Sequence, residues 1–449
     1  MSVPAIAGLV VMALYNLIDT YWAARLGEDA VAALTVVFPW QMIVGAIGVG
    51  TGVGVSSLVS RRFGEGRGEQ ANRAAGQTLL IAGVAGPVLL VLALLFSLPI
   101  VKLFGATPAV EGLARDYLHA VALGVPWVIF LMASSGLYRG TGNTLFPTIT
   151  MSTSAVLNAI FAPLFILGLW GAPRLGVTGL GLATALSQFL AALIALVYLW
   201  SPRGGYTVHL RHLRPHFGVM RDIFQVGAPA FAMQVTGSIV VSLYNGVLGG
   251  YGTAALAAYG INSRLLFLVA MPIFGTSQGL LPIVGFNYGA RQYHRMWQAV
   301  KIAALGTAAL GLVLEAALWL GARAMTHIFT RDPELERLTV LALRLTVLTL
   351  FLLGPQAMFI SALQGMGHGP SALLLSLTRQ LIFLLPGIYL LSARYGVGGA
   401  FAAGPVADAL AFVVSAGFLG YIVRRFPPTR ASEAEAALVA GEGELAVEE

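Results

Sequence analysis

The chain has 449 residues, of which 57% are hydrophobic and only 10% are charged, with a formal net charge of +7 and no cysteine. About a quarter of the residues in a soluble domain are charged, so this composition excludes an ordinary soluble protein. The lack of cysteine excludes disulfides, thiolate metal sites and a cysteine nucleophile. Basic residues concentrate between the apolar stretches, where they orient a chain against anionic lipid. We therefore expect the lipid bilayer as a partner and no nucleic acid.

Apolar stretches follow one another along the chain, and each is long enough to cross about 30 Å of hydrocarbon as a helix. We therefore predict an all-α integral membrane protein with twelve transmembrane helices. No charged segment precedes the first of them, so no cleavable signal peptide is expected. In chain order, the predicted spans are 3–24, 30–59, 74–101, 111–137, 144–169, 176–200, 219–248, 253–285, 297–325, 335–364, 370–393 and 397–423.

The second half of the sequence repeats the first half 225 positions later. A repeat of this length exceeds solenoid units of about 20–50 residues and is typical of a transporter built from two related helix bundles. We predict two pseudo-symmetric six-helix lobes, at 1–200 and 219–425, joined by a connecting loop at 201–218. Matching positions include Gly27 and Gly252, Gly50-Thr51 and Gly275-Thr276, Gly140-x-Gly142 and Gly365-x-Gly367, and, after a five-residue slip, Gly176-Val177 and Gly396-Val397.

The distribution of Arg and Lys between the spans predicts the orientation of the chain. Loops after even-numbered spans, together with the C-terminal flank, carry fifteen of these residues, and loops after odd-numbered spans carry eight. The positive-inside rule then places both termini in the cytoplasm and the chain in the cell (inner) membrane. Residues 426–449 form an acidic tail that we expect to be disordered.

The connecting loop 201–218 is basic and carries His209, His212 and His216 at near-helical spacing. That spacing is open to metal binding, but a solvated basic linker explains it better, and we expect no metal site.

Glycine is abundant within the spans, as in the run Gly48, Gly50, Gly52 and Gly54. In a membrane, such small residues let helices approach closely. The run lacks the Lys-Ser/Thr of a nucleotide-binding loop, and no ATPase motif occurs elsewhere. The energy for transport must therefore come from an ion gradient or from the gradient of the substrate. No cofactor is expected, and an enzyme is disfavoured because all seven histidines lie in or near loops.

Three carboxylates fall inside predicted spans: Asp19 in the first, Glu315 in the ninth and Asp408 in the twelfth. A charge within the bilayer is costly unless it has a partner, water or a proton. Burial favours the neutral form of a carboxylate, so each of the three is a candidate proton carrier or cation ligand.

Asp19 is the strongest candidate for ion coupling. At 1.5 Å per residue it lies about 24 Å along the first span, which runs outward, and Asn158 lies at a similar depth in the fifth. Thr184 lies about 12 Å into the sixth span, which runs inward, and Tyr117 lies slightly shallower in the fourth. A carboxylate, an amide, a hydroxyl and a phenol at one level could bind a hard cation or transfer a proton. The alternative is that Asp19 caps the outer end of its helix in headgroup water.

Pro4 lies fifteen residues before Asp19 in the same predicted helix. Because proline cannot donate a helical hydrogen bond, we expect a bend here, at which the first span straightens or kinks as Asp19 changes state.

Glu315 and Asp408 are secondary candidates. Glu315 is open to facing water or to pairing with an arginine. Asp408 follows Gly404-Pro405, where a proline kink frees a carbonyl, and its alternative is a structural pair with Arg379 or another buried base. The middle of the seventh span offers only Gln234 as a polar counterpart in the second lobe.

Several short motifs point to one family. They are Leu14-Tyr15-Asn16-Leu17-Ile18-Asp19-Thr20 with Arg25-Leu26-Gly27, Arg139-Gly140-x-Gly142-Asn143-Thr144 after the fourth span, and Gly176-Val177-x-Gly179 before the sixth. Through these motifs, residues 1–425 resemble the multidrug and toxic-compound extrusion (MATE) transporters, and most of all their DinF-like prokaryotic branch.

The resemblance implies an antiporter that exports organic cations or other amphipathic compounds against inward H⁺ or Na⁺ by alternating access. It gives Asp19 the role of coupling residue and Pro4 that of the bending proline, and it maps the amide of the fifth-span motif to Asn158. Tyr117 and Thr184 match the tyrosine and threonine of the same network. Drugs or toxic metabolites are the expected small-molecule partners, and the chain is expected to act as a monomer.

The chain departs from the family in the fifth span. The usual pattern is Asn-x-x-x-Asp-Pro, whereas this chain has Ala162 before Pro163. With Asp19 alone, one proton neutralises the site, whereas a sodium ion would have fewer anionic ligands. We therefore expect H⁺ coupling, with Na⁺ as the alternative.

The main competing function is a lipid or polysaccharide-precursor flippase of the same superfamily. Such flippases tend to have extra helices or a strongly cationic central cavity, whereas this chain has about twelve spans and few arginines within them. A channel is disfavoured because paired lobes suit alternating access better.

Overall fold

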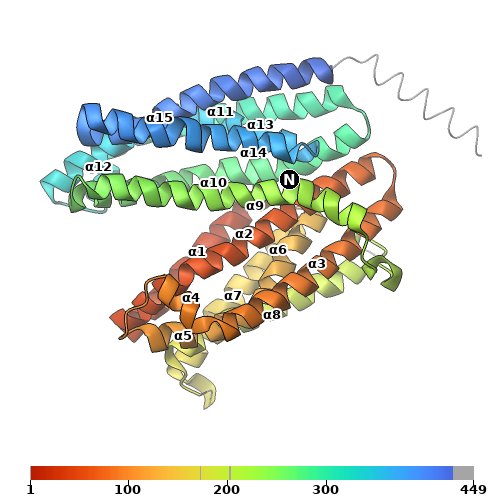
Figure 1. Ribbon diagram of the computed structural model, residues 1–449, viewed down its shortest axis with the longest axis horizontal. Helices are drawn as coiled ribbons and strands as arrows, with labels where there is room; N and C mark the ends of the chain where they lie inside the picture. Colours follow the sequence, from red (N-terminus) through yellow and green to blue (C-terminus); the bar gives the residue numbers. More distant parts are fainter. Residues whose placement is uncertain (1, 172, 202–203, 428–449) are drawn as a thin grey trace, which may run out of the picture. The chain divides into compact units, whose positions relative to one another are not determined.

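Helices make up nearly all of the computed structural model (Figure 1), and none of the residues that it describes lies in a β-strand. The structure describes residues 2–171, 173–201 and 204–427, so nearly all of the predicted acidic tail at 426–449 lies outside the described residues. The fold is all-α, as the sequence predicts.

The chain folds into two compact units. Among the described residues, 3–63 and 67–231 form the first lobe, and 64–66 and 232–427 belong to the second. The first eight helices are α1 (Ser2–Leu26), α2 (Glu28–Gly64), α3 (Gly68–Leu95), α4 (Ser97–Leu103), α5 (Glu111–Ala122), α6 (Val125–Gly140), α7 (Leu145–Leu167) and α8 (Gly176–Trp200). The later helices are α9 (Phe217–Gly249), α10 (Thr253–Gly289), α11 (Tyr293–His327), α12 (Pro333–Thr346), α13 (Leu350–Gly365), α14 (Gly369–Leu377), the π-helix η5 (Thr378–Leu384) and α15 (Leu385–Arg425).

Helix α9 contributes to both lobes, because the division between them falls after residue 231. Its first turns pack in the first lobe, where a Cβ atom added at Gly54 of α2 would collide with the carbonyl oxygen of Ile223. Pro229 lies inside α9, just before the division. The division between the compact units thus falls within a helix. The predicted boundaries, with a connecting loop at 201–218, stay a prediction.

The helix bounds reproduce the sequence repeat. Helix α10 begins and ends 225 positions after α2, and α13 begins and ends 225 positions after α6. Gly176 and Gly396, which the repeat pairs, have positive φ angles of 57° and 63°. This left-handed backbone favours glycine, and in each lobe it precedes the last span.

Two of the predicted spans are broken helices. The fourth, predicted at 111–137, consists of α5 and α6 with a bend of 48° between them. Pro126 lies in the first turn of α6 and cannot continue the hydrogen bonds of α5. The tenth span, predicted at 335–364, is interrupted between α12 and α13 by the 3₁₀ turn η4 (Val347–Thr349).

Helix α15 shows the converse case, because one helix continues through the boundary between two predicted spans. It joins the end of the eleventh, predicted at 370–393, to the twelfth, predicted at 397–423, and only the non-helical Gly396 separates them. The nine long apolar helices, the α5–α6 pair and α1 give eleven spans among the described residues, and dividing the segment Gly369–Arg425 at Gly396 gives the twelve predicted crossings.

Small residues allow α2 and α6 to pack closely in the first lobe. A Cβ atom added at Gly52 of α2 would lie 2.7 Å from the carbonyl oxygen of Met132 in α6. That oxygen belongs to the backbone, so a side chain at position 52 would require one helix to move. Gly45 lies two turns earlier in α2, and an added Cβ atom would meet nothing within 4 Å. Every glycine of the run 48–54 would bring an added Cβ atom within 2.8 Å of a neighbouring atom, whereas Gly45, outside the run, would not.

The connecting segment 204–216 is fastened to α3 by Gln77, whose side chain is fully buried. Its Nε2 donates to the carbonyl oxygens of His212 and Arg214, each at 2.8 Å. Its Oε1 accepts a hydrogen bond from the backbone N–H of His216 at 3.0 Å. One amide thus satisfies three backbone groups of a segment that has little regular structure of its own.

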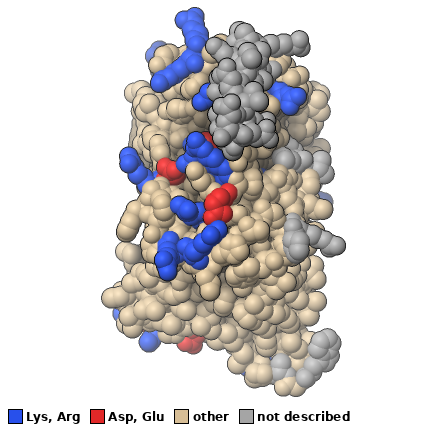
Figure 2. All heavy atoms as spheres, turned by 90° about the vertical axis from the view of Figure 1, so that its right-hand side faces the viewer, with Lys and Arg blue, Asp and Glu red and all other residues tan. Residues whose placement is uncertain are grey.

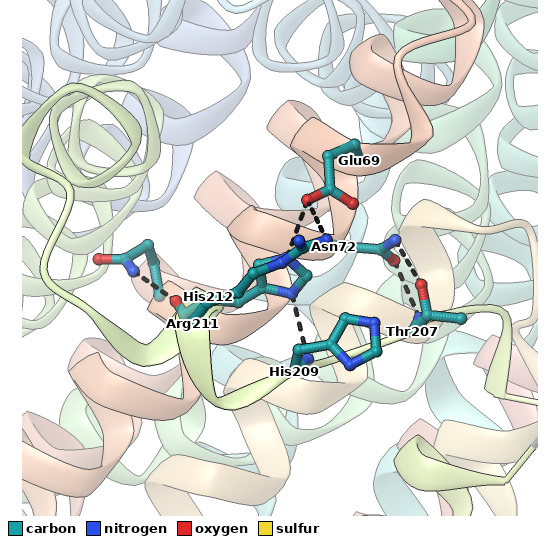
Figure 3. Close-up of polar contacts among 7 residues, drawn as sticks. Glu69, Asn72, Thr207, His209, Arg211 and His212 are labelled. Atoms are coloured by element: carbon teal, nitrogen blue, oxygen red, sulfur yellow. Dashed lines mark hydrogen bonds and ion pairs between the residues drawn. The ribbon is translucent and has the colours of Figure 1, made fainter.

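The ring of His212 adds a second attachment (Figure 3). Its Nδ1 accepts a hydrogen bond from the backbone N–H of His209, and its Nε2 lies 3.0 Å from Oε1 of Glu69 in α3. Asn72 of α3 exchanges two hydrogen bonds with Thr207. Among the described residues, no group of three or more His, Asp or Glu side chains has a metal-binding arrangement.

Basic side chains gather with a few acidic ones on the face that Figure 2 shows. In the first lobe, Arg62 pairs with Asp222 at 3.2 Å and Arg211 with Glu69 at 3.1 Å. Pairs that water and salt can reach contribute little to stability, because their attraction is screened. The buried amide of Gln77 is therefore the stronger attachment of the connecting segment.

Because of the contact between α2 and α6, the same Gly→Ala substitution should affect stability differently at two positions of α2. Gly52→Ala should lower the apparent melting temperature of the purified protein by several degrees, since overpacking costs about 1–3 kcal/mol. Gly45→Ala, the matched control, should leave it unchanged or slightly raised, because alanine favours the helix. Equal melting temperatures for the two variants would contradict the close approach.

The role of Gln77 can be tested by amide hydrogen exchange. Gln77→Ala should speed the exchange of the His216 amide by about tenfold or more, because that amide loses its acceptor. Gln70→Ala, an exposed glutamine on the same helix, is the control and should leave this exchange unchanged. Unaltered exchange in Gln77→Ala would show that other contacts hold the segment.

Candidate functional site

Asp19 lies in α1, and its side chain is partly buried. Its carboxylate accepts a hydrogen bond from the side-chain amide of Asn158 in α7. Its Oδ1 is buried and makes no hydrogen bond with any residue that the structure describes. An ionised carboxylate in apolar surroundings needs more than one such partner. The geometry therefore suits the binding of a proton or a cation at this oxygen.

Asn158 is fully buried and connects Asp19 to α8. Its Nδ2 donates to the hydroxyl of Thr184 at 3.1 Å, and this hydroxyl donates to the carbonyl oxygen of Leu180 at 3.2 Å. Because Thr184 is anchored to its own helix, it fixes the orientation of the amide. Asn158 is thus held in place for the carboxylate.

Tyr117 approaches the same carboxylate from α5, with only 2% of its surface exposed. Its phenol forms a hydrogen bond with Gln41 of α2 and lies close enough to Asp19 to interact with its charge. The structure therefore brings together the four side chains that the sequence singles out and adds Gln41 as a fifth. Their role in ion coupling remains a prediction.

Ala162 is fully buried one turn after Asn158 in α7. Its methyl group provides no ligand atom. Among the described residues, Asp19 is therefore the only carboxylate with contacts in this cluster. Binding of a single proton would leave the cluster uncharged.

Pro4 lies in α1, which the structure describes from Ser2 onward, and the bend predicted there stays a prediction. The carbonyl oxygen of Pro4 accepts a hydrogen bond from Thr148 at 2.6 Å, which ties this part of α1 to the helix that carries Asn158.

The secondary candidates lie in the second lobe and do not form one site. Asp408 is buried and pairs with Arg379, which is the structural pair left open by the sequence. Glu315 accepts a hydrogen bond from the backbone N–H of Phe351, in the first turn of α13. Gln234 is exposed on α9, and none of the contacts described links it to either carboxylate.

Sequence reasoning missed Gln41 and Thr148. Gln41 is an isolated amide in an apolar span, a signal of the same kind as Asn158, but nothing in the sequence fixed its depth relative to Asp19. Thr148 gave no signal, because a threonine hydroxyl can also be satisfied within its own helix, and here it contacts the carbonyl oxygen of Thr144 as well.

Known proteins match the chain over most of its length. The MatE family model matches residues 4–164 and 229–390, two segments that begin 225 positions apart. The multidrug export protein MepA of Staphylococcus haemolyticus is 26% identical over 399 residues, which cover 89% of this chain and 87% of that protein. The FAD transporter of Shewanella oneidensis is 28% identical over 421 residues, which cover 91% of each chain.

A solved structure of a multidrug resistance MATE family transporter of the MOP superfamily, in an outward-facing conformation, has the same fold. It matches with a TM-score of 0.88 over 96% of each chain, at 26% sequence identity. Proteins of this family are transporters rather than enzymes, and the multi-pass helical architecture agrees with that role. Since the family model matches both lobes, this chain belongs to the multidrug and toxic-compound extrusion (MATE) family of membrane transporters.

Proposed function

We propose that this protein is a secondary active antiporter that exports amphipathic or cationic drugs and toxic compounds in exchange for H⁺. The observation that carries the proposal is the buried cluster in which Asn158 binds the carboxylate of Asp19. Family membership and the relative MepA, a multidrug export protein, support the export function. The sequence has no ATPase motif, which leaves an ion gradient as the energy source.

The choice of H⁺ over Na⁺ rests on the number of charges in the cluster. Ala162 removes the second carboxylate expected in the fifth span, so a sodium ion would bind one carboxylate and otherwise neutral oxygens. A proton needs one acceptor only, and the Oδ1 atom of Asp19 has no hydrogen-bond partner among the described residues. Sodium remains the alternative.

In the proposed cycle, Asp19 takes up a proton from the outer side and becomes neutral. The neutral group no longer requires solvation, so α1 can repack against α7, to which Asn158 and Thr148 attach it. This repacking ends the conformation that binds the drug, so that drug release accompanies proton uptake. Return of the proton to the cytoplasm restores the charge and the starting arrangement. We propose that a monomer performs this cycle in the cell (inner) membrane, with both termini in the cytoplasm.

The relatives differ in what they carry, so the family leaves the substrate class open. MepA is a multidrug export protein, whereas the Shewanella relative is named an FAD transporter. A lipid or polysaccharide-precursor flippase is the other alternative, and lipid scrambling by the purified protein, compared with drug efflux, separates it from an exporter.

The first test concerns Asp19. Asp19→Asn removes the charge with little change in shape, so the protein should fold normally but lose gradient-driven export, with activity reduced by about a hundredfold or more. Asp29→Asn, an exposed aspartate in the first turn of α2, is the matched control and should retain export. Drug efflux from cells with equal amounts of each variant is the measurement. Normal resistance with Asp19→Asn would remove Asp19 from the mechanism.

The second test concerns the coupling ion. Purified protein in liposomes should move a fluorescent cationic drug when a pH gradient is imposed in sodium-free buffer. An imposed sodium gradient at equal pH on both sides should give only the rate of empty liposomes, because the cluster has a single carboxylate. Strict dependence on sodium would overturn the assignment to H⁺ and leave the export function standing.

A further inference from the structure

The second lobe contains a polar cluster that the proposed coupling mechanism does not use. Its centre is the ion pair between Arg379, in the π-helix η5, and Asp408 of α15. Asp408 also accepts a hydrogen bond from the hydroxyl of Thr349 at 3.3 Å, at the break between α12 and α13. Both oxygens of the carboxylate therefore have partners.

The guanidinium of Arg379 has fewer of its polar atoms in hydrogen bonds than the carboxylate of Asp408 has. Its Nε donates to Asp408, and its two terminal nitrogens make no hydrogen bond with any residue that the structure describes. The side chain of Arg379 is 29% exposed, compared with 9% for Asp408. The acid thus fixes the orientation of the base from the buried side, and the terminal nitrogens remain available as a preformed pair of donors.

Arg379 lies on the buried side of its helical segment. Leu375 and Ser376, one turn earlier on the same side, are buried. The exposed apolar side chains Leu374 and Leu381 lie on the other side. The guanidinium therefore projects toward the packed side of the segment. Short π-helical segments of this kind are frequent at functional sites, because they redirect side chains within a helix.

The neighbours of Arg379 supply further donors. Tyr259 of α10 lies within electrostatic range of the guanidinium and forms a hydrogen bond with Ser263. Asn262, on the same turn of α10, is fully buried, and its Oδ1 accepts a hydrogen bond from Thr346 at 3.0 Å. Its Nδ2 has no hydrogen-bond partner among the described residues. The Nδ2 atom of Asn262 is itself fully buried, so the donors of this cluster that an acceptor group could reach are those of Arg379.

We propose that Arg379 forms a binding subsite for an anionic group, a carboxylate or a phosphate, on the transported compound. The terminal nitrogens bind two oxygens of that group side by side, as arginine does in bidentate pairs. The substrates would then include amphipathic compounds with an acidic or zwitterionic group in addition to simple cations. This inference rests on the proposed function, since it specifies which compounds the exporter accepts.

A matched pair of ligands isolates the contribution of the acidic group. The probes are a fluorescent rhodamine ethyl ester and the free acid obtained by hydrolysing it, which differ only in the carboxylate. Binding of each is measured by fluorescence anisotropy with full-length protein in nanodiscs. Arg379→Gln should weaken binding of the free acid by about tenfold or more, because a charge-assisted bidentate contact is lost. Binding of the ester should change by less than about twofold.

Control variants separate recognition from folding. Arg379→Gln leaves Asp408 without its buried partner, so the double variant Arg379→Gln/Asp408→Asn removes both charges and should show the same selective loss. Asp408→Asn retains the two terminal nitrogens and should keep binding the free acid. Arg379→Lys keeps the charge but lacks the planar guanidinium. Its affinity for the free acid should lie between those of Arg379→Gln and Asp408→Asn.

Equal weakening of both dyes, no effect on the free acid, or no binding of the free acid by the unchanged protein would overturn the subsite. Export is measured separately with the ester in proteoliposomes. Failure of the unchanged protein to export the ester would contradict the proposed function, whereas the binding comparison still decides the role of Arg379.

Discussion

Hydrocarbon forms no hydrogen bonds, so every polar group inside the bilayer must find its partner within the protein. This constraint explains why the described chain is almost entirely helical, since a helix satisfies its own backbone. It also explains what surrounds the exceptions. At the break between α12 and α13, Glu315 accepts a hydrogen bond from the backbone N–H of Phe351, and the hydroxyl of Thr349 donates one to Asp408. These polar side chains thus lie where the backbone is interrupted.

The two lobes share a backbone plan but differ in chemistry. Asp19 of the first lobe corresponds, 225 positions later, to Tyr244, whose hydroxyl donates to the carbonyl oxygen of Ala400. A phenol satisfied in this way carries no charge, so the position equivalent to Asp19 has no carboxylate. Two charged residues of the last two spans, Arg379 and Asp408, instead pair with each other. The second lobe therefore repeats the helices of the first lobe without repeating the carboxylate of Asp19.

Hydrophobicity and the repeat were sufficient to predict the fold from the sequence. The number of spans, the two lobes and the depth of Asp19, Asn158, Thr184 and Tyr117 follow from helix length and direction. The breaks in the fourth and tenth spans could not be predicted, because an apolar window looks the same whether the helix within it is straight or broken. Gln41 and the open side of Arg379 depend on how helices rotate about their axes, which a single sequence does not specify.

The buried amide of Gln77 makes the connecting segment part of the first lobe, because three of its backbone groups depend on a side chain of α3. The division between the lobes falls later in the chain, within the continuous helix α9. Pro229 lies just before that division and has no N–H to donate to the turn before it. A substitution in the connecting segment should therefore affect the packing of the first lobe, although the segment lies between the two halves of the sequence.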